Sequence, residues 1–423
     1  MANETIEDIQ ALTNTFVDEQ WDPTITVREW WARLTKAQLV NTTLPEEAGG
    51  RGWSTAQAAA ANRVLTERRV VGPAAGLGML LAAPTVAAYG SPEQIDKWVP
   101  AILDGTDSWC QLFSEPGAGS DLAGLGTRAV KDGDEWIITG QKVWTSNGHE
   151  SDWGMLIART DPELPKHQGI TYFGFPMKQD GVEIRPLTEM TGRALFNEVF
   201  ISEARVPDAY IIGGRGNGWR VANATLAYER AGIGGAHGGG FGTASPGETA
   251  GHLDQPVGDF LGKREATSVG AVGRRVLGLL SSEAAARGKG DDPVLRDRLA
   301  QLHILHRLAS MTMKRHAAER RSGRKPTGLG AGVEGNLAKL HNTETLLLAR
   351  DLAGEVLGPD AAIVGDDAAT EGFLQELMLF SPAPPIYGGT DEVQRNVIGE
   401  RGLGLPKEPG PSKETPFSEL PKS

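Results

Sequence analysis

The spacing of hydrophobic residues changes twice along this chain of 423 residues. From Thr5 to about Gly105, apolar residues recur every three or four positions, as expected of amphipathic helices. Around Trp109 the spacing falls to two, and five strand-like runs follow, separated by glycine, proline or aspartate turns. From Gly218 the helical spacing returns. This order restricts the chain to an α+β fold in which a strand-rich segment lies between two helical ones.

These changes predict three domains and a tail. A chain of this length exceeds the size of a single hydrophobic core, which agrees with several domains. We expect a mobile loop where residues 234–251 are polar and rich in glycine. The predicted parts are an N-terminal helical domain (1–108), a central antiparallel β domain (109–214), a C-terminal helical bundle (215–406) and a disordered tail (407–423).

Charge and cysteine content exclude several classes of function. The formal net charge of −12 opposes a general role on nucleic acid or anionic membranes, because phosphate binding needs a net basic face. Cys110 is the only cysteine, so no intrachain disulfide can form and a reducing, cytoplasmic location is expected. The acidic first ten residues do not resemble a signal peptide.

Two further signals are discounted. Residues 72–90 carry no charge, but two prolines and four glycines disfavour a membrane span, and a buried helix pair is predicted. His303 and His306 lie three residues apart, but no nearby cysteine or acidic partner completes a metal site. The sequence therefore predicts neither a membrane span nor a bound metal.

Two short blocks before residue 150 carry the strongest chemical signal. The first, CQLFSEPGAGSD, places Ser114, Glu115 and Ser120 around a turn whose proline and glycines leave backbone N–H groups free to face a polar ligand. The second, GQKVWTSNG, places Trp144 and Ser146 at a strand end, one aromatic plate beside one hydroxyl. A planar ring with polar edges fits such a surface.

In both blocks, and in five further segments that follow in family order, the chain resembles the acyl-CoA dehydrogenases. These enzymes are flavoproteins that oxidise the α,β bond of acyl thioesters. The resemblance implies FAD as cofactor, an acyl-CoA substrate, a trans-2-enoyl-CoA product, an electron-transferring flavoprotein as acceptor, and a homotetramer or heterotetramer. The five segments are PEEAGGRG, YGSPEQIDKWVPAI, TGRALFNEVFISEARVP, GNGWRVANATLAYER and IYGGTDEVQRNVIGER.

The resemblance also implies where the catalytic base lies. Much of the family carries a glutamate between a tyrosine and a glycine, but here Gly388 follows Tyr387. In relatives similar to the isovaleryl and long-chain enzymes, the base instead precedes an arginine on the helix after the β domain, where this chain has Glu229 and Arg230. Glu229 is the candidate base, the N–H of Gly388 is expected to hold the thioester oxygen, and Arg230 is expected near the substrate. The alternatives are a solvated helix glutamate, a plain turn glycine and a structural ion pair.

By the same resemblance, Phe113 and Ser114 are expected at one edge of the flavin, and Trp144 and Ser146 at the opposite flank. Ser120 is expected to contact the pantetheine or phosphate region of coenzyme A. The alternatives are a core aromatic for Trp144 and a turn or cap serine for Ser120.

More cofactor contacts are expected in the C-terminal domain. Thr390 and Glu392 follow in the segment that closes over the flavin in the family. Arg287 matches an arginine by which a second subunit reaches the flavin phosphates, but the phenylalanine that usually follows is missing. Glu355 replaces a glutamine of another cross-subunit contact, and a carboxylate would repel a pyrophosphate.

Three functional hypotheses follow. The first is an FAD-dependent acyl-CoA dehydrogenase in which Glu229 removes the α proton. The second is a non-catalytic or flavin-sharing subunit of a heteromeric complex, motivated by Gly388 in place of the glutamate, by Glu355 and by the missing phenylalanine after Arg287. The third is a flavin-dependent monooxygenase on the same fold. Small residues at Ala224, Ala227 and Gly232 suggest room for a bulky acyl group on the first reading.

Overall fold

The computed structural model describes residues 4–233, 244–261, 274–322, 332–365, 367–407, 409–410, 412 and 414–420. Most of the segment that the sequence predicts to be a mobile loop, residues 234–243, lies outside these ranges. The chain divides into two compact units. Unit 1 comprises Met1–Glu189, Arg193–Arg264 and Pro411–Ser423, and unit 2 comprises Met190–Gly192 and Glu265–Gly410.

The N-terminal part of unit 1 is helical, as predicted. Among the helices described there, α1, α2, α3 and α5 each begin after a hydroxyl side chain that accepts a backbone N–H of the first turn: Thr5, Thr26, Ser54 and Ser91. These caps satisfy N–H groups that the helix itself leaves unpaired. The helices of unit 1 are α1 (Ile6–Gln20), α2 (Val27–Lys36), α3 (Thr55–Glu67), α4 (Ala83–Tyr89), α5 (Pro92–Leu103) and α6 (Gly218–Ile233).

The uncharged segment forms one helix rather than the predicted pair. A π-helical turn over Gly78–Ala82 continues directly into α4. Within the described part of the chain, no helix combines the length and apolar character that a membrane crossing requires.

The described strands of unit 1 form one seven-stranded sheet with the order β1-β4-β2-β3-β7-β6, and β5 pairs with β4. Of the six strand pairs described, four are antiparallel as predicted, whereas β4 runs parallel to both β1 and β2. The five runs predicted from the sequence correspond to β3 through β7. The strands are β1 (Trp109–Leu112), β2 (Arg128–Asp132), β3 (Glu135–Ser146), β4 (Trp153–Arg159), β5 (Ile170–Pro176), β6 (Val182–Leu187) and β7 (Phe196–Pro207).

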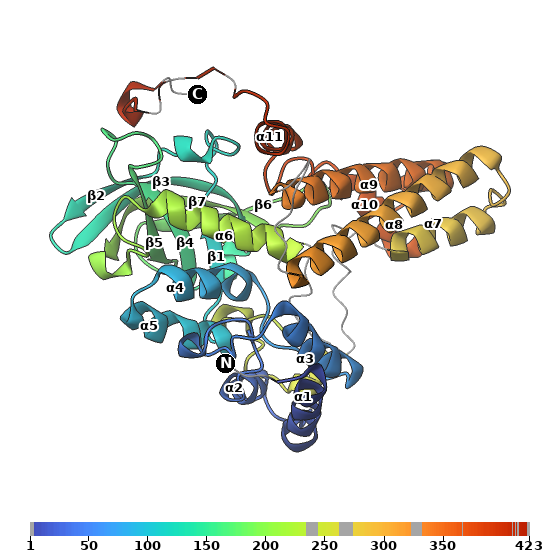
Figure 1. Ribbon diagram of the computed structural model, residues 1–423, viewed down its shortest axis with the longest axis horizontal. Coiled ribbons are helices and arrows are strands. Elements are labelled where there is room, and N and C mark those ends of the chain that lie inside the picture. Colours follow the sequence, from blue (N-terminus) through green and yellow to red (C-terminus); the bar gives the residue numbers. More distant parts are fainter. Residues whose placement is uncertain are drawn as a thin grey trace. The chain divides into compact units, whose positions relative to one another are not determined.

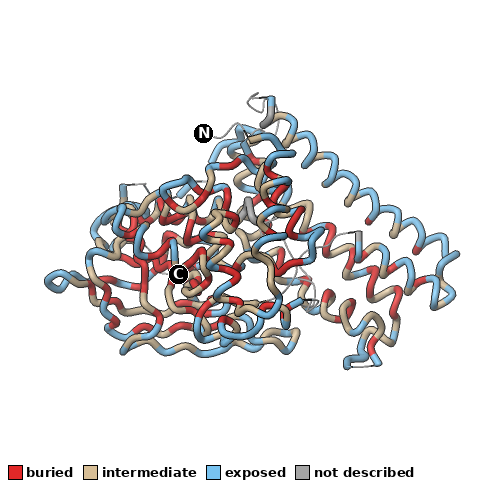
Figure 2. The backbone as a smooth tube through the Cα atoms, turned by 90° about the horizontal axis from the view of Figure 1, so that it is seen from below, coloured by how far each residue is buried: buried red, intermediate tan, exposed pale blue. Residues whose placement is uncertain are grey.

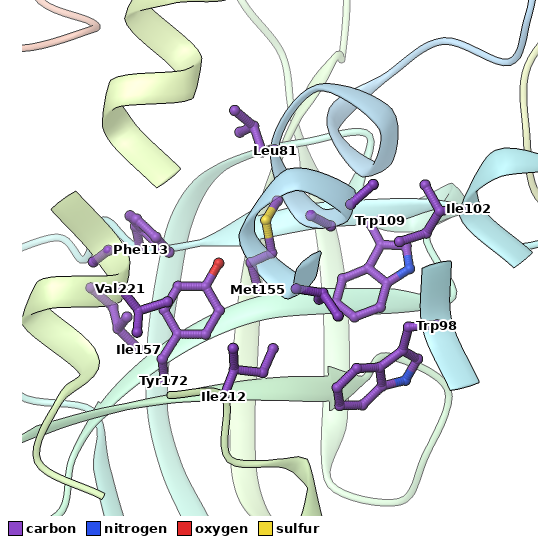
Figure 3. Close-up of a cluster of buried hydrophobic side chains, with 14 of the residues drawn as sticks. Leu81, Trp98, Ile102, Trp109, Phe113, Met155, Ile157, Tyr172, Ile212 and Val221 are labelled. Carbon is purple, nitrogen blue, oxygen red and sulfur yellow. The ribbon is translucent and has the colours of Figure 1, made fainter. Parts of the chain in front are cut away.

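A hydrophobic cluster joins helices α4, α5 and α6 to the sheet (Figure 3). Trp98 of α5 packs edge-on against Trp109 of β1, with 5.7 Å between ring centroids. Phe113, Tyr172 and Val221 extend the cluster towards α6. Figure 2 shows buried and exposed residues alternating along helices and strands, as expected of elements that bury one face. Burial of apolar surface thus holds these elements together.

Helix α6 lies beside β5 and β4 (Figure 1) and packs within unit 1, although the sequence analysis grouped it with the C-terminal bundle. Its buried face includes Val221, Ala222 and Thr225. Its first residue, Gly218, lies so close to β5 that an added Cβ would sit 2.6 Å from the carbonyl carbon of Thr171. Only glycine allows the helix to begin there.

Unit 2 is a helical bundle, as predicted, in which α7, α8 and α9 lie side by side (Figure 1). A buried ion pair ties α9 to α11: Nζ of Lys339 lies 2.5 Å from Oδ1 of Asp391. The short helix α10 was not predicted. The helices of unit 2 are α7 (Arg274–Ala286), α8 (Pro293–Arg321), α9 (Glu334–Leu357), α10 (Phe373–Phe380) and α11 (Asp391–Val397).

The tail predicted to be disordered is ordered near its end. The backbone N–H groups of Phe417 and Ser418 donate to the carbonyls of Leu164 and Pro162. The guanidinium carbon of Arg159 lies 3.7 Å from the centroid of the Phe417 ring. The prediction fails for this stretch because its partners lie far away in the sequence, where composition cannot reveal them.

The substitution Gly218→Ala is expected to lower the free energy of unfolding by about 1–3 kcal/mol, because the added methyl group meets the backbone of β5. The matched control is Gly278→Ala on α7, where nothing lies within 4 Å of the added Cβ. The control should leave stability unchanged or raise it by about 0.5–1 kcal/mol. Urea denaturation followed by circular dichroism measures both, and equal stability of Gly218→Ala and the wild type would contradict the expectation.

Candidate functional site

The two sequence blocks meet at a buried ion pair. Nζ of Lys142, a fully buried side chain in β3, lies 2.8 Å from Oε1 of Glu115 and donates to the carbonyl of Phe113 at 3.0 Å. The Glu115 carboxylate also accepts the backbone N–H groups of Gly126 at 2.6 Å and Thr127 at 3.0 Å. We call these two side chains and three backbone groups the Lys142 clasp. It ties the loop after β1 to the middle of β3.

The clasp keeps its carboxylate ionised inside the protein. Burial alone would raise the pKa of Glu115, but Lys142 and the N–H donors outweigh it and hold the pKa below its ordinary value. Burial lowers the pKa of Lys142, and Glu115 opposes that effect. Burial also lowers the pKa of the neighbouring Arg159 to about 10, so this side chain stays charged at neutral pH. Glu115 therefore has a structural role, because its carboxylate is occupied by Lys142 and by two backbone N–H groups.

The loop approaches β3 closely because β3 carries a glycine at that point. A Cβ added to Gly140 would lie 2.2 Å from Oγ1 of Thr127. The N–H of Val143 donates to the carbonyl of Ser114 at 3.0 Å. The ring of Phe113 is buried, with its centroid 5.9 Å from that of Tyr172. Main-chain groups of Phe113 and Ser114 are thus held against β3.

Trp144 faces outward at an irregularity in β3. The pairing of β3 with β7 shifts register between Lys142 and Thr145, both of which are buried. Between them, Trp144 adopts a left-handed backbone conformation with φ +60°, and its side chain is 62% exposed. The ring of Phe196 packs edge-on against it, with 5.9 Å between centroids. The core-aromatic alternative is therefore wrong, and an exposed aromatic plate in a strained conformation is typical of a ligand site.

The two serines at the ends of the blocks remain accessible. Ser146 is half-buried at the end of β3. Ser120 is exposed, and a Cβ added to Gly119 before it would meet nothing within 4 Å. The hydroxyl of Ser120 thus lies at the surface of unit 1, and that of Ser146 lies at the end of a strand.

Glu229 lies away from the solvated face of α6. That outer face carries the exposed residues Arg220, Asn223 and Ala227. Glu229 instead follows the buried Thr225 by one helical turn, on the same side, and is half-buried. The alternative of an ordinary solvated helix glutamate does not describe this position.

A buried network of hydroxyl groups positions this part of α6. Oγ1 of Thr225 lies 3.0 Å from Oγ1 of Thr85 in α4. It also lies 3.3 Å from the hydroxyl oxygen of Tyr172 in β5. The network links the helix to both of its neighbours. Next to Glu229, Arg230 has a helical backbone, but its side chain lies outside the described part.

In unit 2, Gly388 has φ +65°, a conformation that disfavours the glutamate found there in much of the resembled family. Its carbonyl accepts Nε2 of Gln394 at 2.8 Å, and no group in the described ranges accepts its N–H. Thr390 caps α11 by accepting the N–H of Val393 at 3.2 Å, and Glu392 is exposed in the first turn. Among the described residues of unit 2, Gly388 therefore offers a backbone N–H donor, Thr390 caps a helix and Glu392 is a solvent-exposed carboxylate.

Arg287 and Glu355 are both engaged in ion pairs within unit 2. Nη1 of Arg287 lies 2.5 Å from Oδ2 of Asp360, which is the main reason that the pKa of Arg287 is raised, and Nε lies 3.4 Å from Glu283. Glu355 pairs with Arg298. Because Arg298 neutralises Glu355, the repulsion of a pyrophosphate by a lone carboxylate is weaker than the sequence suggests.

The sequence analysis missed Lys142. A signal was available, because Trp136, Ile138, Gly140 and Lys142 alternate along β3 on one face. The first two of these are buried, so a lysine two residues beyond Gly140 would also point inward and need a carboxylate partner.

Comparisons with known proteins agree on one family. Three family models match: acyl-CoA dehydrogenase, N-terminal domain (residues 3–106), middle domain (110–204) and C-terminal domain (266–403). The chain is 38% identical over 385 residues to acyl-CoA dehydrogenase IpdE1 of Mycobacterium tuberculosis, covering 90% of this chain and 88% of that protein.

Two solved structures are similar along almost their whole length. One is the Tcur3481-Tcur3483 steroid ACAD, with TM-score 0.69 and 25% identity, covering 96% of this chain and all of that one. The other is the ChsE4-ChsE5 complex from Mycobacterium tuberculosis, with TM-score 0.69 and 26% identity, covering 96% and 100%. The expected α+β fold is confirmed.

Replacing Lys142 by methionine is expected to lower the free energy of unfolding by about 3–5 kcal/mol, because Glu115 is left buried and uncompensated. Adding Glu115→Gln should recover part of this loss. The control is Lys166→Met, which breaks the exposed pair with Asp121 and should cost at most about 1 kcal/mol. Denaturant titration of the three variants checks the ranking, and similar losses for the buried and the exposed pair would refute it.

Proposed function

The chain belongs to the acyl-CoA dehydrogenase family, and we propose that it catalyses the α,β-dehydrogenation of an acyl-CoA thioester to the trans-2-enoyl-CoA. Members of this family are oxidoreductases acting on CH–CH bonds and FAD-dependent flavoproteins. The observation that carries the proposal is the half-buried Glu229 on the inner side of α6, combined with a glycine at position 388.

The surface around Trp144 fits a flavin. It offers an exposed aromatic plate, the hydroxyl of Ser146 and the main chain of Phe113 and Ser114, all held by the sheet and the Lys142 clasp. A binding surface keeps its geometry when the residues behind it are themselves held in place, as the sheet and the Lys142 clasp do here. We infer that these residues hold the isoalloxazine ring of the flavin. When bound there, the flavin would accept the hydride from the β carbon of the substrate.

In the proposed reaction, Glu229 takes the α proton of the thioester. Its partial burial limits water around the carboxylate, as general-base catalysis on a weak carbon acid requires. The N–H of Gly388 supplies a donor to the thioester oxygen as that oxygen gains negative charge. Ser120 and Arg230 would lie along the coenzyme A and substrate portions, and Thr390, Glu392 and Arg287 would complete the flavin surroundings.

Three finer assignments are part of the same proposal. An electron-transferring flavoprotein would accept the electrons, as the family implies. The cytoplasm is the expected location, in keeping with a single cysteine. Similarity to a structure described as a steroid ACAD supports an acyl group that is bulky and ring-bearing.

Glu229→Gln is expected to abolish bleaching of the flavin by acyl-CoA thioesters while the protein still binds FAD. The glutamine keeps the size of the side chain but cannot accept the proton. Glu344→Gln, which changes an exposed glutamate of α9, serves as control and should bleach as the wild type does. Anaerobic mixing with a thioester panel, without NAD(P)H, measures the rate. Undiminished bleaching by Glu229→Gln would refute the assignment, and a requirement for NAD(P)H and oxygen would favour a monooxygenase.

A flavin-sharing subunit of a heteromeric complex is the second candidate. The similar structures Tcur3481-Tcur3483 and ChsE4-ChsE5 each name two components, and Arg287 is already paired with Asp360 in this chain. On this reading, the protein purified alone is colourless and gains stoichiometric flavin only with a second chain of the family. A yellow, active preparation of this chain alone would exclude it. Absorbance at the flavin band and the mass of the assembly give the answer.

A further inference from the structure

A cavity of about 270 Å³ lies in unit 1 between the loop 41–45, the segment 79–88 and α6. Its apolar walls include Leu44, Met79 and Leu80. A cavity of about 150 Å³ is enough to hold a benzene molecule. The volume therefore suits a rigid group of one to two rings better than a thin extended chain.

Three polar side chains, Asn41, Thr43 and Tyr228, interrupt these walls. Two of them bond mainly within the protein. Nδ2 of Asn41 donates to the carbonyl of Met79 at 3.2 Å, and the hydroxyl of Thr43 donates to Oδ1 of Asn41 at 3.0 Å. The hydroxyl of Tyr228 makes no hydrogen bond to any group in the described part of the chain. Tyr228 thus lines the cavity and carries a hydroxyl that no described group of the protein engages.

This phenol remains a donor at neutral pH. Burial raises the pKa of Tyr228, and the neighbouring Tyr89 raises it further. A purely hydrocarbon occupant would remove water from the hydroxyl without offering an acceptor, which is unfavourable. An occupant with a suitably placed oxygen avoids that cost.

We propose that this cavity receives the distal part of the acyl group and that Tyr228 donates a hydrogen bond to an oxygen there. The substrate class is an acyl-CoA thioester whose acyl group is ring-sized and carries a ketone or hydroxyl oxygen remote from the thioester. The inference rests on the proposed function, because Tyr228 directly precedes the candidate base on α6.

Ala224 and Ala227, where the sequence suggested room for a bulky group, do not line this cavity. Ala227 is exposed on the outer face of α6, and the exposure of Gly232 lies outside the described part. The small residues beside the cavity are Ala87 and Ala88 of α4.

A matched pair of thioesters tests the proposal: 3-(4-oxocyclohexyl)propanoyl-CoA and 3-cyclohexylpropanoyl-CoA, which differ in one carbonyl oxygen. The ratio of their kcat/KM values should favour the oxo compound by about threefold to tenfold in the wild type, the range of one neutral hydrogen bond. In Tyr228→Phe the ratio should fall to about one. Titration calorimetry with the two enoyl-CoA products should show the same change in relative affinity.

Tyr89→Phe is the control, since Tyr89 lies close to Tyr228 but does not line the cavity. It should keep the wild-type ratio. A wild type without preference, or a Tyr228→Phe variant that retains it, overturns the inference while leaving the dehydrogenase intact. If neither thioester bleaches the wild-type flavin and no simpler acyl-CoA does, the proposed function fails and the inference fails with it.

Discussion

The buried pair of Lys142 and Glu115 is the interaction on which the candidate site depends. Removing an ammonium and a carboxylate from water costs several kcal/mol for each ion, and their attraction offsets this only when the remaining hydrogen-bonding groups are also satisfied. Here the carbonyl of Phe113 and two backbone N–H groups satisfy them. The same contacts hold the loop after β1 against the strand that turns Trp144 outward. An ion pair with no chemical role in the proposed reaction thus supports the surface proposed to hold the flavin.

A second constraint is the close fit of α6 to the sheet. Gly218 lets the helix begin against β5, and the hydroxyl of Thr225 joins it to both α4 and β5. The helix carries the proposed base, Glu229, beside Tyr228, the proposed donor to the far end of the substrate. On these proposed assignments, a single helix would set the distance between the reacting carbons and the remote oxygen of the substrate. Substrates would then be selected by length as well as by polarity.

The sequence predicted the regular elements well and their partners poorly. The strands and the helix cap at Ser91 could be predicted, because alternation and capping involve residues that are two to four positions apart. The partner of Glu115 could not be predicted, because a turn glutamate gives no local sign of the lysine 27 residues later that neutralises it. The tail was misread for the same reason, since Phe417 packs on Arg159. The position of Glu229 was predicted by likeness to a family, and the structure adds only that it lies off the solvated face.

By itself, the sequence determined the order of helical and strand-rich segments, the absence of an intrachain disulfide and the family. These follow from composition, local periodicity and ordered motifs, which do not depend on contacts between distant segments. Only the tertiary structure decided that Lys142 is buried, that Trp144 is exposed, that α6 belongs with the sheet and that Tyr228 lines a cavity. Each of these depends on which distant segments pack together. Local sequence preferences allow many such arrangements, and close packing of the side chains selects one of them.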